Sequence, residues 1–133
     1  MSTGKILTAA ILALTLGAPM ANAKAHGNDL VHSRKLGGVV FMMNEVHMSL
    51  YTYDNDTPGV SNCYGECATA WPPALLAGDA KLGRNYTLVE RTDGTFQAAY
   101  LGRPLYLWAG DKKIGDIKGD GVGGVWRLAR PEN

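Results

Sequence analysis

The stretch Leu50-Tyr51-Thr52-Tyr53-Asp54-Asn55-Asp56 decides the fold, because the chain contains it twice. The second copy is Leu105-Tyr106-Leu107-Trp108-Ala109-Gly110-Asp111, which lies 55 positions later. The same shift places Trp71 on Trp126. A repeat of this size indicates duplicated supersecondary units that share one core.

Each copy places two aromatic rings on one face of a strand, because strand side chains alternate between the two faces. The aspartate that follows falls where the strand should end in a turn, and Asp side chains readily accept backbone N–H groups there. We therefore expect Asp56 and Asp111 to fix these turns and the rings to form core or binding surface. The candidate motif residues are Tyr51, Tyr53, Asp56, Trp71, Tyr106, Trp108, Asp111 and Trp126.

The first residues have the pattern of a secretory signal. Lys5 precedes the apolar run Ile6 to Leu16, and Ala21-Asn22-Ala23 is an A-x-A cleavage site. We predict a signal peptide over 1–23, a flexible lead over 24–37 and a single domain over 38–133, with repeats at about 38–78 and 86–131. The mature protein is expected to be periplasmic or secreted.

The charge balance limits the partners. Loss of Lys5 leaves equal numbers of basic and acidic side chains, since the whole chain has 13 Lys and Arg against 12 Asp and Glu. A neutral domain without a basic cluster has no electrostatic reason to bind nucleic acid or anionic lipid. No second apolar run has the length of a transmembrane segment. The expected partner is an unknown ligand or an envelope protein.

Strand patterns recur in both halves of the chain. Val39 to Met43 reads as a buried strand that forms a hairpin with Met48 to Tyr53. Tyr86 to Arg91 and Phe96 to Tyr100 flank an Asp-Gly turn, and Leu105 to Trp108 follows as a third strand. The predicted fold is mainly β, with two duplicated hairpin-based units packed as one small barrel-like or sandwich-like domain.

Two cysteines, Cys63 and Cys67, lie four residues apart. In an exported protein this pair predicts a structural disulfide. The redox-active alternative is disfavoured because its spacing is C-x-x-C, and covalent haem is disfavoured because it requires C-x-x-C-H.

Met43, His47 and Met48 crowd one predicted hairpin. Thioether and imidazole ligands suit copper, particularly Cu(I), so copper or haem handling is the alternative function. Methionines in such a hairpin also serve as core filler, and in that case no cofactor is bound. No nucleophile-elbow serine and no phosphate-cradling loop is present, so we expect no catalytic residues and no enzymatic activity.

The two motif copies resemble the Y-x-[FWY]-x-x-D motif of a bacterial secreted-repeat family, whose members are described as predicted lipoproteins of unknown function. The first copy, through Cys63, Cys67 and Trp71-Pro72-Pro73, is similar to the C-x-x-x-C and W-P-P extension of that family. Two departures stand out: there is no lipobox cysteine, and His47 replaces the glycine found as Gly102 in the second copy. The resemblance implies the two-repeat architecture and brings no established activity. From the residues themselves we expect an exported, non-enzymatic β domain that binds a ligand or associates with the envelope.

Overall fold

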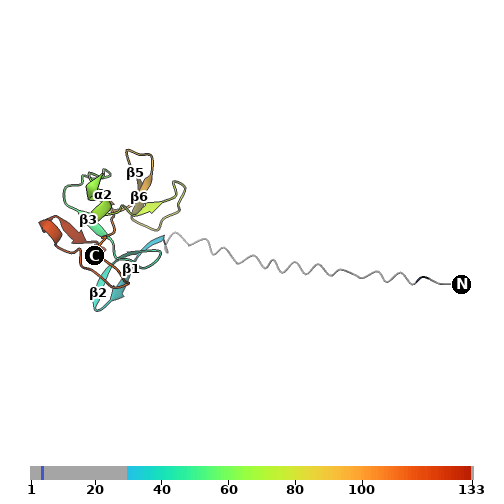
Figure 1. Ribbon diagram of the computed structural model, residues 1–133, viewed down its shortest axis with the longest axis horizontal. Helices are drawn as coiled ribbons and strands as arrows, with labels where there is room; N and C mark the ends of the chain where they lie inside the picture. Colours follow the sequence, from blue (N-terminus) through green and yellow to red (C-terminus); the bar gives the residue numbers. More distant parts are fainter. Residues whose placement is uncertain (1–3, 5–29, 133) are drawn as a thin grey trace.

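The structure is a computed structural model that describes residue 4 and residues 30–132. Apart from residue 4, the predicted signal peptide and the start of the predicted lead therefore lie outside the described residues. Figure 1 shows the β1–β2 hairpin at one end of the domain and the β5–β6 hairpin at the other, with β3 between them. The elements are β1 (Val31–Leu36), β2 (Val39–Asn44), β3 (Tyr51–Tyr53), α2 (Glu66–Ala70), β4 (Leu75–Leu76), β5 (Tyr86–Glu90), β6 (Phe96–Tyr100), β7 (Arg103–Pro104), η1 (Val122–Gly124) and β8 (Trp126–Leu128).

The first hairpin joins β1 to β2 through Gly37 and Gly38, whose positive φ angles of 58° and 82° suit a two-residue hairpin turn. The prediction of a flexible lead through residue 37 is wrong for 31–36, which pair with β2 along their whole length. The sequence pattern hid this strand because four of its six side chains are exposed and do not alternate in polarity.

The predicted hairpin between residues 39–43 and 48–53 is confirmed only at its start. Met43 and Ser49 form an antiparallel bridge, and Leu50 donates its N–H to the carbonyl oxygen of Met42 at 3.0 Å. β3 then leaves this hairpin and pairs with β8 at the far end of the chain. The early strands of the first repeat are thus completed by the last strand of the second.

The second hairpin follows the sequence prediction closely. β5 pairs with β6 around the Asp93-Gly94 turn, and β4 and β7 also pair with β6. The predicted strand over 105–108 is not a regular strand, and its pairing consists of bridges from Tyr106 to Tyr51 and to Pro73.

Equivalent residues of the two repeats make equivalent contacts across the domain. The N–H of Ala74 donates to the carbonyl oxygen of Leu105 at 3.0 Å, and the N–H of Ala129 donates to that of Leu50 at 2.9 Å. Both pairs map onto each other under the 55-residue shift. The end of each repeat therefore packs on the motif of the other repeat, so the repeats are interlocked.

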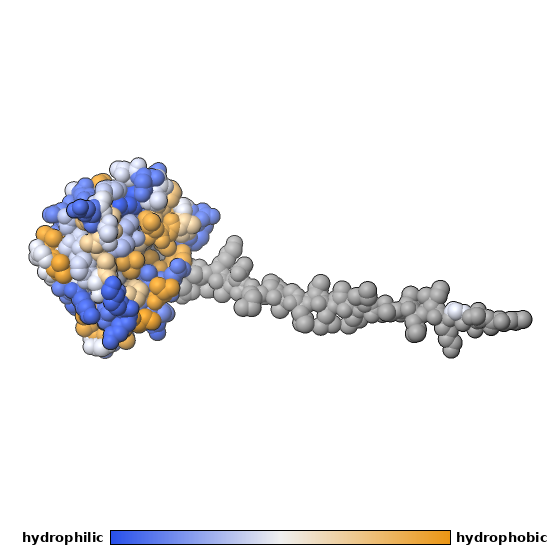
Figure 2. Space-filling model, in the orientation of Figure 1, coloured by the Kyte–Doolittle hydropathy of each residue, from blue (hydrophilic) through white to orange (hydrophobic). Residues whose placement is uncertain are grey.

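Two buried clusters form the core. One is largely aliphatic and the other contains the motif aromatics together with Cys63. The prediction of a mainly β domain is confirmed, and the three sheets of the described residues are open, so the domain is not a barrel. The helices found among residues 30–132 are all too short to span a membrane. Figure 2 shows polar and apolar side chains intermingled on the face that it presents.

Candidate functional site

The two motif copies exchange hydrogen bonds. The Tyr51 hydroxyl donates to Asp111 Oδ2 at 2.5 Å, and the Tyr106 hydroxyl donates to Asp56 Oδ2 at 2.6 Å. Each tyrosine therefore binds the aspartate of the other repeat. A turn-fixing role within one repeat, as expected from the sequence, describes only part of the function of these carboxylates.

The second oxygen of each aspartate binds the loop that follows it. Asp56 Oδ1 accepts the N–H of Asn62 at 2.7 Å, and Asp111 Oδ1 accepts the N–H of Lys118 at 3.0 Å. Burial raises the pKa of Tyr51 well above its usual range, and the hydrogen bond to Asp111 raises it further. The phenol is therefore a stable donor at neutral pH.

The other motif aromatics form one stack. Tyr53 lies on Trp126 with centroids 4.2 Å apart, and Trp126 lies on Trp71 at 3.8 Å with the planes 4° from parallel. Trp71 in turn contacts Trp108 at 4.2 Å. Tyr53 and Trp108 are equivalent under the shift, as are the two inner rings, so the stack has the same approximate symmetry as the hydrogen bonds. The main role of these aromatic side chains is therefore to pack the core.

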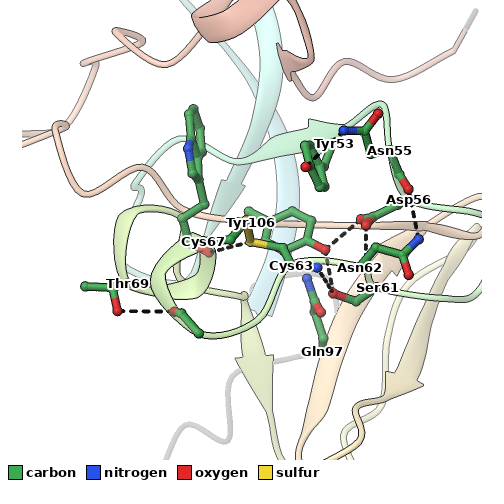
Figure 3. Close-up of a disulfide and its surroundings, with 12 residues drawn as sticks. Tyr53, Asn55, Asp56, Ser61, Asn62, Cys63, Cys67, Thr69, Gln97 and Tyr106 are labelled. Atoms are coloured by element: carbon green, nitrogen blue, oxygen red, sulfur yellow. Dashed lines mark hydrogen bonds between the residues drawn. A yellow bond between two sulfur atoms is a disulfide. The ribbon is translucent and has the colours of Figure 1, made fainter.

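The disulfide borders a buried polar network, part of which is drawn in Figure 3. Cys63 and Cys67 are joined as predicted, with an S–S distance of 2.05 Å. Arg91 is 5% exposed and donates to the carbonyl oxygen of Cys63 at 2.8 Å and to Ser61 Oγ at 2.9 Å. Ser61 in turn lies 2.6 Å from the Tyr106 hydroxyl, so the network leads to Asp56.

Sequence reasoning missed this network. Arg91 also donates to Gln97 Oε1 at 2.8 Å, and the Gln97 amide donates to the carbonyl oxygen of Leu105 at 2.7 Å. The available clue was Gln97, a polar residue inside the otherwise apolar strand Phe96–Tyr100. A buried amide must find partners, and Gln97 finds them in Arg91 and Leu105, just before and just after its own hairpin strand.

A groove opens beside Tyr53 with a volume of about 590 Å³. Both repeats contribute to it, through the motif turn of the first and the β6–β7 turn of the second. Arg127 lines the groove and holds Asp54 in a bidentate ion pair, in which Nε donates to Oδ1 and Nη2 donates to Oδ2, both at 2.9 Å. The lining residues are Thr52, Tyr53, Asp54, Asp56, Thr57, Pro58, Leu101, Gly102, Arg103, Pro104 and Arg127.

The groove carboxylates have opposite pKa shifts. The Arg127 guanidinium beside Asp54 lowers the pKa of that carboxyl through its hydrogen bonds. Burial raises the pKa of Asp56, an effect opposed by the hydrogen bonds from Tyr106 and Asn62. Asp54 is therefore held ionised, whereas Asp56 takes up a proton more readily than a free aspartate does.

The predicted metal ligands only partly converge. Met43 and His47 line a second cavity of about 230 Å³, whereas Met48 is not among its lining residues and donates its N–H to Asn44 Oδ1 at 2.9 Å. Met42 packs in the aliphatic cluster. Within residues 30–132, no group of three or more His, Cys, Asp or Glu side chains is placed to hold a metal ion.

Comparison of the sequence with known protein families identifies the family of this chain. The family described as "Secreted repeat of unknown function" matches residues 31–75 and 87–130, which together make up more than half of the chain. Comparisons with curated proteins and with solved structures find no match. The first matched range includes β1, which is therefore part of the repeat and not a lead to it. The chain belongs to this family of secreted repeats and carries two copies of the repeat.

Proposed function

We propose that the protein is an exported, non-enzymatic binding domain whose ligand occupies the groove beside Tyr53. Export is supported by the description of the family as secreted. The observation that carries the proposal is the groove itself. Its volume of about 590 Å³ is within the range of small-molecule sites, and it combines an aromatic ring with several polar side chains.

The groove chemistry suits a polar, hydroxylated ligand such as a sugar. Tyr53 is partly exposed and is supported from behind by Trp126, so it offers a rigid ring at low entropic cost. Arg103 is 65% exposed, and its contact with Glu132 is long at 3.7 Å, which leaves its guanidinium able to reach a ligand. Donors and acceptors around an aromatic wall are what a hydroxylated ring needs.

Binding is a better account of the groove than catalysis. Both groove carboxylates already have hydrogen-bond partners within the protein. Asp54 accepts from Arg127, and Asp56 accepts from Tyr106 and Asn62. The described residues that line the groove include no histidine, cysteine, serine or lysine that could serve as nucleophile or base. The arrangement supplies contacts and orientation without an activated group.

The test is to titrate the protein with monosaccharides and disaccharides, including neutral sugars, amino sugars and acidic sugars. Binding is monitored through tryptophan fluorescence and through amide chemical shifts. Because Tyr53 stacks on Trp126, a ligand in the groove should change the emission. Arg103→Ala should weaken binding without changing the melting temperature, since surface ion pairs contribute about 0–1 kcal/mol. The matched control is Arg34→Ala, which lies at the other cavity. Saturable binding lost only in Arg103→Ala supports the proposal. Absence of binding by every sugar, or equal binding by both variants, contradicts it.

A further inference from the structure

His47 occupies a backbone position for which the second repeat uses glycine. Its φ is 63°, and that of the equivalent Gly102 is 81°. A left-handed conformation is strained for an L-residue, whereas glycine adopts it freely. A side chain retained at such a position indicates a use for that side chain.

The His32 imidazole and the Met43 thioether lie close to His47. The His32 and His47 rings are 5.2 Å apart between centroids, in an edge-to-face arrangement. His32 is directly opposite Met43 in the β1–β2 register, so their side chains lie on one face of the hairpin. Met43 and His47 both line the cavity of about 230 Å³. Three residues from β1, β2 and the following turn therefore converge.

We propose that His32, His47 and Met43 form a binding site for a single Cu(I) ion. Imidazole and thioether are the ligands that soft Cu(I) selects. Zn²⁺ is a poorer fit, because it prefers four N, S or O ligands and the described residues provide no cluster of three or more His, Cys, Asp and Glu. Haem is also a poor fit, because the cavity is smaller than the roughly 300 Å³ at which ligand pockets begin.

Arg34 competes with the ion. Its Nη1 lies 3.3 Å from His47 Nδ1 and would have to move away when the metal binds. Arg34 is exposed, so it can do so without disturbing the core. Removing this charge should therefore tighten Cu(I) binding.

The experiment titrates the mature protein with Cu(I) under anaerobic conditions against the chelator bicinchoninate, whose colour reports free ion. One ion per chain is expected. His47→Gly should weaken binding by about tenfold or more, since loss of even an outer-shell partner costs a metal site that much. This variant should also melt at a higher temperature, because glycine suits the left-handed backbone, so the loss cannot come from unfolding.

Two further variants localise the site. Met43→Leu should weaken binding, whereas Met42→Leu, an equally buried neighbour in the other cluster, should not. Arg34→Ala should tighten binding by about fivefold, the effect of removing one unit charge about 4 Å away in water. The proposal is overturned if no ion binds at one per chain. It is also overturned if His47→Gly binds as wild type does, if the two methionine variants are equal, or if Arg34→Ala binds no more tightly.

Discussion

Tyr51 and Tyr106, equivalent residues of the two motif copies, lie opposite each other and exchange both backbone hydrogen bonds, at 2.8 and 2.9 Å. From this shared point each side chain extends to the aspartate of the opposite repeat. The two motif copies therefore form a reciprocal Tyr–Asp exchange, in which each tyrosine binds the aspartate of the other repeat. Neither repeat contains a complete Tyr–Asp contact by itself. These exchanged Tyr–Asp hydrogen bonds stabilise the contact between the two repeats, while Tyr53 and Asp56 of the first motif copy also line the groove.

Arg91 should be one of the most sensitive positions in the fold. Arg91→Leu leaves the carbonyl oxygen of Cys63 and the side chain of Gln97 without their buried donor. Unsatisfied buried groups cost about 1–3 kcal/mol each, so we expect a loss of roughly 3 kcal/mol in the free energy of unfolding. Urea denaturation provides the measurement. A loss below about 1 kcal/mol, the level of an exposed ion pair, would contradict a structural role for this network.

The two groove aspartates should affect acid stability in opposite directions. The pKa of Asp56 is raised in the folded state, so its contribution to stability grows as the pH falls and is lost as the pH rises through the folded pKa. The pKa of Asp54 is lowered, so its contribution is present above the unfolded pKa and is lost as the pH falls.

Urea denaturation from neutral pH down to about pH 3, below the usual pKa of an aspartate, should therefore separate the two variants. Asp56→Asn should lose stability on acidification more steeply than wild type, and Asp54→Asn less steeply. The second effect should be small because Asp54 is exposed to solvent. A curve for Asp56→Asn that is shallower than wild type would show that burial does not govern this carboxyl.

Gly119 is required by the aromatic core. A Cβ atom there would lie 2.8 Å from the Trp71 ring and 2.9 Å from the Tyr51 ring. Because these rings are fixed by stacking, Gly119→Ala should destabilise by about 1–3 kcal/mol, as overpacking does. At Gly78 the atoms nearest to a Cβ belong to the Phe96 ring, which is partly exposed and able to move, so Gly78→Ala should cost less. Equal melting temperatures for the two variants would argue against a rigid stack.

The disulfide should contribute modestly to stability. The loop between Cys63 and Cys67 is short, so the chain-entropy gain is about 2 kcal/mol. Cys63→Ala/Cys67→Ala should lower the free energy of unfolding by about that amount while the protein still folds. Mass spectrometry after alkylation without reductant should find no free thiol in the exported protein. Two alkylated cysteines would contradict the disulfide.

The parts of the fold that sequence could predict are those governed by local pattern. The Asp93-Gly94 hairpin and the duplicated motif carry their own signals, because turn residues and aromatic alternation act over a few positions. The disulfide followed from the export signal together with the spacing of the cysteines.

The remaining features depend on partners distant in sequence. The pairing of β3 with β8, and of Tyr51 with Asp111, joins segments about half the chain apart, and a residue pattern does not specify which copy binds which. β1 was missed because its exposed side chains do not alternate in polarity. His32 was missed as a neighbour of His47 for the same reason, since the β1–β2 register places it there.

A double-mutant cycle tests the reciprocal Tyr–Asp exchange most directly. Tyr51→Phe and Asp111→Ala should couple by about 0.5–3 kcal/mol in the free energy of unfolding, as residues in contact do. The control cycle pairs Tyr51→Phe with Asp56→Ala, the aspartate of the same repeat, and these should add to within about 0.3–0.5 kcal/mol. Coupling between Tyr51 and Asp111 with additivity between Tyr51 and Asp56 is the predicted result. The reverse pattern, with coupling inside the repeat and additivity across it, would contradict the exchange of contacts on which this account of the fold rests.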